Sequence, residues 1–288
     1  MLKSLINSMR LRTLPLSLAG VVCGGLLAMG RHDNSWLAFA LVLLTACLLQ
    51  ILSNLSNELG DHLSGVDGED REGPKYSMAD GGLTVGQMWR AINWTVVACC
   101  VCGLLMLLFS FQFRILDYQF FVLLLLGVAA IWAATHYTLG KNPYGYKGLG
   151  DLFVFLFFGL ASVMGSYFAL AHTLALSVVP PAVGCGLLSA AVLNVNNIRD
   201  MASDEGIRKT IPLSIGERNA KIYQTCLIAG GYLCYILSRP SWFIALLSLP
   251  FAAHVILLWR RHGSGLDPLL PLLVISTFVL SLIYALIP

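Results

Sequence analysis

Long apolar segments alternate with short polar connections along almost the whole chain. A helix needs about 20 apolar residues to cross a bilayer, and nine windows qualify: 13–30, 36–59, 88–110, 118–139, 150–172, 177–199, 217–238, 241–259 and 268–287. Most connections leave room for little more than a turn. The pattern predicts an all-α polytopic membrane protein, with about nine transmembrane helices around a central cavity and no appended soluble domain.

Composition agrees with a chain surrounded by lipid. Hydrophobic residues make up 57% of the sequence and charged residues 11%, whereas soluble domains carry about 25% charged residues. The net charge of +3 comes without a basic cluster interleaved with aromatics, so no nucleic-acid partner is expected. All eight cysteines fall inside apolar runs, where small apolar filler is a better interpretation than a metal cluster.

The distribution of Lys and Arg predicts the orientation in the membrane. With the amino terminus in the cytoplasm, 15 of the 18 Lys and Arg fall on the cytoplasmic side. The first apolar run has a basic flank but no small-residue cleavage site, so we interpret it as a transmembrane helix and not a signal peptide. We expect a multi-pass protein of the cytoplasmic (inner) membrane, with the two long loops, near 60–87 and 200–216, on the cytoplasmic face.

Two of the predicted helices end in similar polar sequences. The second window runs into "NLSNELGD" and the sixth ends in "NVNNIRD". In each, an Asn precedes an Asp by four residues (Asn57 and Asp61, Asn196 and Asp200), which places the pair on one helical face. Carboxylates at helix C-termini oppose the macrodipole, so two such ends favour a functional role. We expect residues 1–288 to form a single domain of two pseudo-repeat halves, whose acidic motifs near 57–67 and 196–204 face each other.

The amides and acids near these ends form a set of hard oxygen donors. Such donors suit Mg²⁺, which usually keeps waters and is held by one or two carboxylates plus substrate phosphate. The alternative, solvated loop acids, is favoured for Glu69, Asp70 and Glu72. The candidate metal ligands are Asn57, Asp61 and Asp67 at the first end, and Asn196, Asp200 and Asp204 at the second.

Basic residues lie in both long loops, beside the acids. Arg71 and Lys75 follow the first motif, and Arg208 and Lys209 follow the second. Lys and Arg match phosphate well, although the bias of cytoplasmic loops toward positive charge explains any single one equally. Lys209 is the preferred candidate because it follows Asp204 within five residues.

Three segments resemble the motifs of one family, the UbiA superfamily of intramembrane aromatic prenyltransferases. "NELGDHLSGVD" and "NNIRDMASD" are similar to its two aspartate-rich motifs, and Tyr137-Thr-Leu-Gly-Lys141 is similar to its Tyr-x-x-x-Lys motif. The order of the motifs and the helix count agree over nearly the whole chain. The segments "RLRTLPLS" and "YTLGKNPYGYKGLGDLFVFLFFG" resemble the branch that prenylates 1,4-dihydroxy-2-naphthoate. One departure is Glu58, where the general pattern has Asp.

The resemblance implies a reaction and a role for each matched residue. A polyprenyl group would pass from polyprenyl diphosphate to 1,4-dihydroxy-2-naphthoate with loss of pyrophosphate and CO₂, giving demethylmenaquinone in menaquinone biosynthesis. Both acidic motifs would bind Mg²⁺, with Asp61 and Asp200 essential for turnover. Lys141 would contact the diphosphate, and Tyr137 would lie near the allylic cation. Arg12 would meet the aromatic carboxylate, unless it only anchors its helix at the membrane surface. The implied substrate-binding residues are Arg12, Arg71, Lys75, Lys141 and Lys209.

Two alternatives remain open at this point. Another aromatic acid such as 4-hydroxybenzoate could be the acceptor, in which case the product would keep its carboxylate. A membrane transporter also uses acids in a cavity, but its site usually lies near the bilayer midplane, whereas these acids gather at one face. The pattern specifies neither the isoprenoid length nor the oligomeric state.

Overall fold

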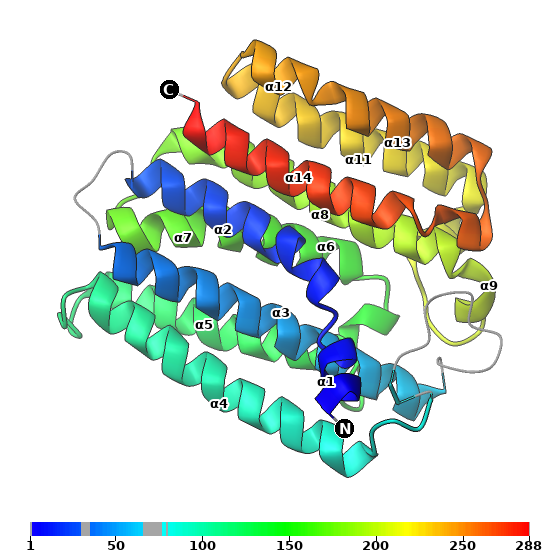
Figure 1. Ribbon diagram of the computed structural model, residues 1–288, viewed down its shortest axis with the longest axis horizontal. Coiled ribbons are helices and arrows are strands. Elements are labelled where there is room, and N and C mark those ends of the chain that lie inside the picture. The colour runs from blue at the N-terminus through cyan, green and yellow to red at the C-terminus, as the bar shows by residue number, and fades with distance from the viewer. Residues whose placement is uncertain (1, 30–34, 66–76, 79, 288) are drawn as a thin grey trace.

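Long helices run side by side along one axis and form the body of the molecule (Figure 1). The computed structural model describes residues 2–29, 35–65, 77–78 and 80–287. The α-helices are α1 (Leu2–Ser8), α2 (Leu14–Met29), α3 (Trp36–Ser64), α4 (Val85–Ser110), α5 (Tyr118–His136), α6 (Gly150–Val154), α7 (Ser162–Ala171), α8 (Val179–Arg199), α9 (Met201–Asp204), α10 (Ile211–Ile215), α11 (Glu217–Ser238), α12 (Trp242–Leu246), α13 (Ser248–Arg260) and α14 (Leu269–Leu286). Shorter segments are the 3₁₀ turns η1 (Leu11–Thr13), η2 (Tyr144–Tyr146), η4 (Leu176–Val178) and η5 (Gly263–Leu266), and the π-helical η3 (Phe155–Ala161).

The predicted windows agree closely with these helices. In the described part of the chain, eight helical stretches are long and apolar enough to cross a membrane. The one predicted span that is not among these eight is α11, which begins and ends at residues 217 and 238 as expected. Its first half is more polar than the others because it carries Glu217, Arg218, Lys221 and Gln224. The all-α polytopic fold is confirmed, and about nine helices is close to the observed number.

Local sequence explains where several helices begin. Ser35 accepts a hydrogen bond from the backbone N–H of Ala38 and caps α3. Thr84 and Gln87 form a reciprocal capping box at the start of α4. Asp117 accepts from the backbone N–H of Gln119 and caps α5. These side chains satisfy backbone donors that the first helical turn leaves without partners.

Small residues allow the helices to approach closely. A Cβ atom at Gly24 in α2 would overlap the carbonyl oxygen of Val163 in α7, and one at Gly159 in η3 would lie 2.5 Å from Cα of Gly186 in α8. Lipid tails are as apolar as the side chains, so helices in a membrane associate through such close packing and not through a hydrophobic driving force. The largest buried apolar cluster accordingly joins α2, α7, α8, α11 and α14.

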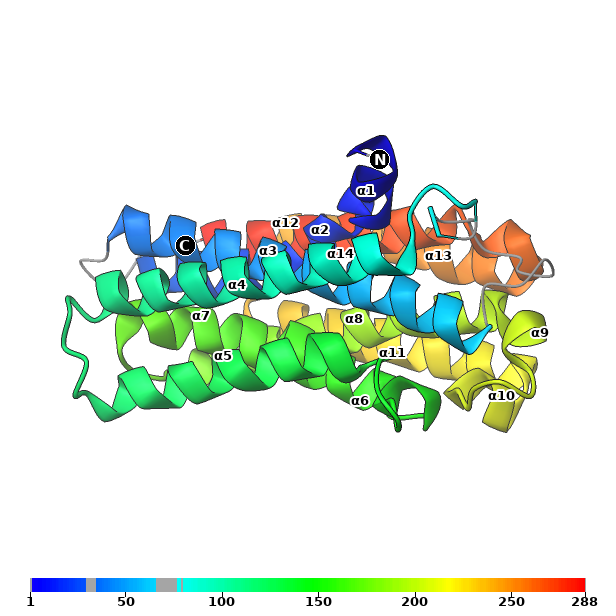
Figure 2. The ribbon, with the colours of Figure 1, turned by 90° about the horizontal axis from the view of Figure 1, so that it is seen from below.

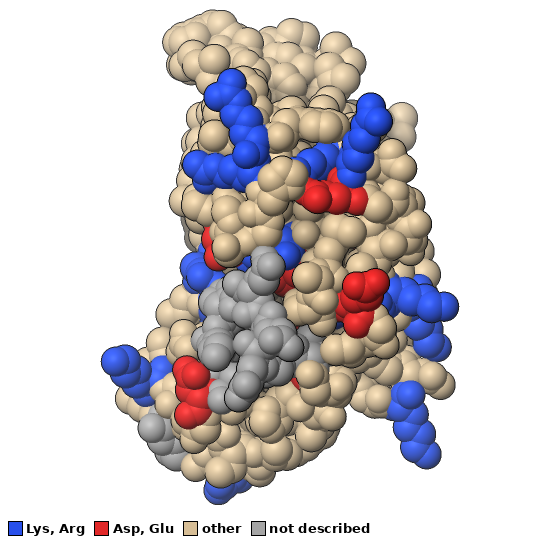
Figure 3. Space-filling model, turned by 90° about the vertical axis from the view of Figure 1, so that its right-hand side faces the viewer, with Lys and Arg blue, Asp and Glu red and all other residues tan. Residues whose placement is uncertain are grey.

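The C-terminal ends of α3 and α8 lie at the same end of the bundle. Figure 2 shows α9 and α10 at this end as well. Charged side chains of both signs gather on the corresponding face of the molecule (Figure 3). The fold therefore brings the two acidic sequence motifs, which are about half the chain apart, to one end of the helices.

Candidate active site

A cavity of about 620 Å³ runs between the helices from the acidic end into the apolar body of the bundle. Its polar lining includes Asn57 and Asp61 from α3, and Asn196 and Asp200 from the end of α8. Its apolar lining comes from α2, α3, α4, α5, α14 and the π-helical segment, and includes Leu16, Val42, Met106, Leu123, Leu126, Phe157, Phe158 and Val274. π-Helical turns are often found at functional sites, and here the π segment forms part of the wall.

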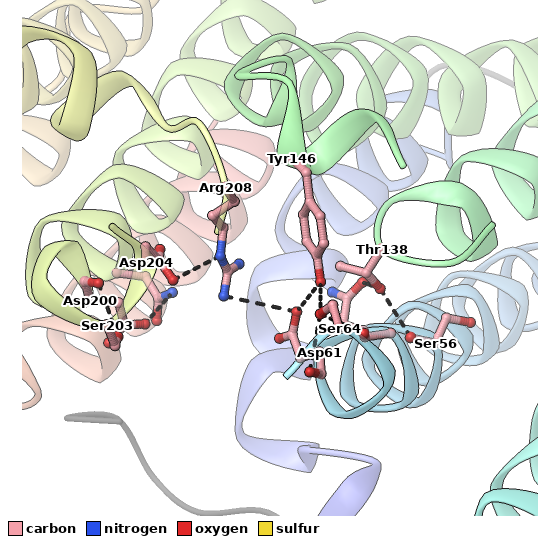
Figure 4. Close-up of polar contacts among 12 residues, drawn as sticks. Ser56, Asp61, Ser64, Thr138, Tyr146, Asp200, Ser203, Asp204 and Arg208 are labelled. Atoms are coloured by element: carbon pink, nitrogen blue, oxygen red, sulfur yellow. Dashed lines mark hydrogen bonds and ion pairs between the residues drawn. The ribbon is translucent and has the colours of Figure 1, made fainter. Parts of the chain in front are cut away.

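Asp61 lies at the cavity end of α3 and is held by groups from other segments. It is buried, and its Oδ1 accepts a hydrogen bond from the hydroxyl of Tyr146 at 3.0 Å. That hydroxyl also lies 2.7 Å from Oγ of Ser64 (Figure 4). One turn before Asp61, Oδ1 of Asn57 accepts from the hydroxyl of Thr138 at 3.3 Å. The loop after α5 therefore orients both polar residues of the first motif.

Asp200 at the end of α8 is held by its own neighbour in the chain. Arg199 donates from Nε to Oδ1 and from Nη2 to Oδ2, both at 2.7 Å. The same guanidinium donates from Nη2 to Oδ1 of Asn196 and from Nη1 to Oδ1 of Asp267, both at 2.8 Å. A bidentate pair of this kind fixes geometry as well as charge. It also ties the second motif to the turn before α14.

Arg208 connects the two motifs across the cavity mouth. Its Nε lies 2.8 Å from Oδ1 of Asp204, and its Nη2 lies 3.9 Å from Oδ1 of Asp61. The guanidinium also lies over the ring of Tyr146, 5.6 Å from the ring centroid. Figure 4 shows Arg208 between the carboxylates from the two halves of the chain. One guanidinium therefore contacts Asp61 of the first motif and Asp204 of the second.

Residues 17–268 match the UbiA prenyltransferase family. The chain belongs to this family. It is therefore a multi-pass membrane enzyme that transfers prenyl groups, as the three sequence motifs predicted.

Individual relatives support the same assignment. The chain is 45% identical over 233 residues to a 1,4-dihydroxy-2-naphthoate octaprenyltransferase of Escherichia coli (strain K12), covering 81% of this chain and 75% of the relative. It is 33% identical over 296 residues to the protein of that name from Haemophilus influenzae, covering 99% and 95%. The solved structure of a UbiA homologue from Archaeoglobus fulgidus bound to DMAPP and Mg²⁺ superimposes with a TM-score of 0.58, at 16% identity, over 97% of this chain and 99% of that one. This likeness shows the UbiA fold.

Carboxylates outnumber guanidiniums in the ion pairs that join the two motifs. Burial, together with the nearby Asp200 and Asp61, raises the pKa of the Asp204 carboxyl to about 6 even though Arg208 opposes the shift. Four carboxylates (Asp61, Asp200, Asp204 and Asp267) share the contacts of two guanidiniums (Arg199 and Arg208). A cation entering between the motifs would offset this excess.

The donor set at this end of the UbiA cavity fits Mg²⁺. Carboxylate and amide oxygens are the ligands this ion prefers, and it usually takes its remaining ligands from water and substrate phosphate. Within the described ranges, no group of three or more His, Cys, Asp or Glu is close enough to hold a metal by itself. Asp67, the third candidate ligand of the first motif, lies outside the described residues.

The structure separates the remaining predicted site residues into two groups. Arg12 and Tyr137 line the cavity. Lys141 and Lys209 are exposed and are not among its lining residues. The predicted substrate-binding residues Arg71 and Lys75 lie outside the described part of the chain.

Four further residues contact the motifs. One of them, Arg208, is named from the sequence, where Lys209 is preferred to it, and the other three are not selected there. Arg208 is one turn after Asp204, and its backbone N–H donates to the Asp204 carbonyl at 3.2 Å, so the spacing of four was an available signal. Arg199 adjoins Asp200 and was also visible in the sequence. Tyr146 and Asp267 come from loops far away in the chain, and no local pattern marks them.

Proposed function

We propose that this UbiA-family enzyme transfers a polyprenyl group from polyprenyl diphosphate to 1,4-dihydroxy-2-naphthoate. Pyrophosphate and CO₂ are released, and the product is demethylmenaquinone, formed as its quinol, in menaquinone biosynthesis. The observation that carries the proposal is a cavity with one acidic end and a long apolar wall, in a chain 45% identical to a relative with this named activity. An amphipathic diphosphate needs both environments at once.

The acidic end binds the diphosphate. In this proposal Asn57, Asp61 and Asp67 would hold one Mg²⁺, and Asn196, Asp200 and Asp204 would hold the other. Bound Mg²⁺ neutralises the charge that develops on the leaving pyrophosphate oxygen. Arg208, which already contacts both motifs, offers its guanidinium to the phosphate oxygens. Lys141 and Lys209, which are exposed, and Arg71 and Lys75 of the first long loop complete the basic residues that this proposal assigns to substrate binding.

The apolar wall holds the isoprenoid and keeps water away from the reacting carbon. Each buried methylene contributes roughly 0.8 kcal/mol to binding, so a polyprenyl chain gains much of its affinity here. Exclusion of water also protects an allylic cation from hydrolysis. The ring of Tyr137, which lines the cavity next to the acidic end, stabilises positive charge through its π face.

The acceptor enters the same cavity, which Arg12 lines. The electron-rich ring carbon that bears the carboxylate forms a bond to the allylic carbon of the donor. The allylic C–O bond breaks, and its electron pair leaves with pyrophosphate. The carboxylate then leaves as CO₂, and the electrons of that C–C bond restore the aromatic ring. No ring proton has to be removed in this sequence.

The proposal includes a place and an orientation. The protein acts in the cytoplasmic (inner) membrane as one domain with two acidic half-motifs, and its amino terminus and active-site loops face the cytoplasm. The gathering of both motifs and many charged side chains at one end of the bundle supports this (Figure 3). The count of Lys and Arg supports the cytoplasm as the side on which that end lies.

A two-acceptor assay tests the reaction. Purified protein receives Mg²⁺, a polyprenyl diphosphate and either carboxyl-labelled 1,4-dihydroxy-2-naphthoate or carboxyl-labelled 4-hydroxybenzoate. We expect labelled CO₂ and a prenylated naphthoquinol from the first acceptor, and no product from the second. A prenylated hydroxybenzoate that retains its label would overturn the choice of acceptor.

A further inference from the structure

Helix α3 carries a second stripe of polar residues beside the one that faces the diphosphate end. Gln50, Asn54 and Glu58 follow one another at intervals of four and are buried, at 8%, 4% and 0% exposure. Residues four apart lie on one face of a helix, so these three form a continuous ladder. A buried polar group costs free energy unless it is hydrogen-bonded, and three in a row need specific partners.

Gln50 and Asn54, the first two residues of this ladder, hold the turn that precedes α2. The amide nitrogen of Asn54 donates to the carbonyl oxygen of Met9 at 2.8 Å and to Oγ1 of Thr13 at 3.0 Å. The amide nitrogen of Gln50 donates to Oγ1 of Thr13 at 3.2 Å and to Oδ1 of Asn54 at 3.0 Å. The Met9 carbonyl can only accept, so it fixes the orientation of the Asn54 amide. Asn54 then fixes that of Gln50.

The turn held in this way has an unusual backbone. Arg10 adopts the left-handed conformation, with φ 48° and ψ 53°, which non-glycine residues rarely take unless surrounding contacts stabilise it. Arg10 and Arg12 both line the cavity. The backbone conformation between Met9 and Thr13 therefore decides where two cationic side chains stand at the mouth.

The outer rung, Glu58, faces away from the cavity. Its Oε1 accepts from the hydroxyl of Ser8 at 3.1 Å and from the backbone N–H of Met78 at 3.0 Å. It is absent from the cavity lining, whereas its neighbour Asn57 belongs to it. The motif resemblance would make this position a metal ligand. The structure instead gives it the end of α1 as its partner.

Helix α1 needs this support because it stands apart from the bundle. Figure 2 shows it projecting from the side of the parallel helices. Two further hydrogen bonds join α1 to the turn before α4: the Ser77 hydroxyl donates to the carbonyl of Ser4 at 2.7 Å, and the Asn7 amide donates to that hydroxyl at 3.4 Å. Leu5 of α1 also packs against the buried apolar cluster that α3 and α4 share. Glu58 joins both pieces, α1 and the turn at Met78, to α3.

We infer that the Gln50–Asn54–Glu58 ladder is a positioning device for the arginine-bearing amino-terminal turn, and that Glu58 is not a metal ligand. The ladder fixes the turn that carries Arg12 beside residues 50–54 of α3. Arg12 and Asn57 line the same cavity, so this turn bears on where the acceptor meets the diphosphate. This role rests on the proposed function at one point, because that function supplies the aromatic carboxylate that Arg12 binds. The tie between Glu58 and α1 is a property of the protein alone.

Amide hydrogen exchange on the full-length protein in detergent tests that tie without any reaction. Gln keeps a carbonyl oxygen at the position of Oε1, whereas Asp is one methylene shorter. We expect Glu58→Gln to leave exchange in residues 2–13 unchanged, and Glu58→Asp and Ser8→Ala to speed it about tenfold. Asp80→Asn, which removes an exposed carboxylate near the same turn, serves as the control. Unchanged exchange in both Glu58→Asp and Ser8→Ala would refute the ladder.

Kinetics then separate positioning from metal binding. A positioning role predicts that Glu58→Asp raises the KM for the naphthoate about fivefold or more, while the Mg²⁺ concentration for half-maximal rate stays within about twofold. A ligand role predicts the reverse: Asp is tolerated and Gln raises the Mg²⁺ requirement. That reverse result would overturn the inference. If the wild-type protein made no product, the proposed function would fail, and the exchange experiment would still decide the ladder.

Discussion

The two acidic helix ends look alike in sequence but carry their charge in different ways. At the end of α8, Asp200 forms a bidentate pair with Arg199, the residue before it, at 2.7 Å. At the end of α3, Asp61 accepts from the neutral hydroxyl of Tyr146, and the guanidinium near it, Arg208 at 3.9 Å, comes from the loop after α9. One end has its own counter-charge, and the other depends on a residue from the opposite half of the chain.

This difference bears on which end responds to a bound cation. A buried carboxylate with a close guanidinium is largely compensated, and removing one partner of such a pair leaves an expensive buried charge. A carboxylate held by a neutral donor keeps most of its charge for a ligand. The α8 end therefore contributes to the stability of the fold as well as to the site. The α3 end is the more sensitive to what enters the cavity.

Substitution of the two aspartates should produce the largest effects. Asp61→Asn and Asp200→Asn should each reduce the rate by roughly 10³-fold, because each removes a charge that faces the diphosphate. They should differ in stability. Asp200→Asn leaves Arg199 with a lost partner and should cost about 3 kcal/mol, whereas Asp61→Asn should cost less than about 1 kcal/mol.

Initial rates and thermal unfolding in the same detergent measure both quantities. Glu205→Gln is the matched control, since this acid is exposed and adjoins Asp204. Equal losses of stability for the two asparagine variants would show that the Arg199 pair does not make Asp200 more important to the fold than Asp61. A wild-type rate for either variant would remove that residue from the site.

Substitution of Arg208 tests whether the α3 end depends on a residue from the other half of the chain, and its effect on the rate should be intermediate. Arg208→Gln should raise the KM for the diphosphate and lower the rate by about 10- to 100-fold, since it removes the contact to both motifs. Arg208→Lys should recover only part of this loss, because a single ammonium does not reproduce the planar guanidinium fork. Lys209→Gln is the comparison: this neighbour is exposed, so its effect should be smaller. A larger effect at Lys209 would restore the preference drawn from the sequence.

Sequence patterns predicted the helices well because lipid imposes a simple rule on length and polarity. They also predicted that Asn57, Asp61, Asn196 and Asp200 would share a cavity, since spacing and orientation are properties of the helices themselves. The choice of Lys209 over Arg208 was less successful as a guide to contacts. The backbone after Asp204 turns through Gly206, at φ 78°, and this turn directs Arg208 inward and Lys209 outward.

Other contacts depend on packing between distant segments. The loop at residues 144–149 is placed by a bridge between Lys147 and Lys209, and the backbone N–H of Lys209 donates to the carbonyl of Tyr146 at 3.1 Å. The local sequence does not predict that the Tyr146 hydroxyl of this loop will donate to Asp61. The sequence also did not show that the Glu58 side chain points toward α1, because a motif gives the residue at a position and not the direction of its side chain.

Tyr146→Phe sharpens the comparison with the smallest expected effect. The change removes the hydroxyl that donates to Asp61 and keeps the ring beneath Arg208. A single hydrogen bond to a carboxylate is worth about 1.5 kcal/mol, so the rate should fall by about 3- to 10-fold. Burial, followed by the charge of Asp61, raises the pKa of Tyr146 above its ordinary value, which keeps the hydroxyl a neutral donor at neutral pH.

The pH–rate profile distinguishes this orienting role from acid–base chemistry. Because Tyr146 stays protonated throughout, the variant should shift the whole profile down without moving its limbs. Ser64→Ala, which leaves the bond from Tyr146 to Asp61 in place and removes only the second contact of the hydroxyl, should lose less activity. A limb that moves in Tyr146→Phe would mean that the hydroxyl exchanges a proton during turnover. The Tyr146 hydroxyl would then take part in the reaction. Asp61 and Asp200 would differ in proton transfer and not only in how their charge is compensated.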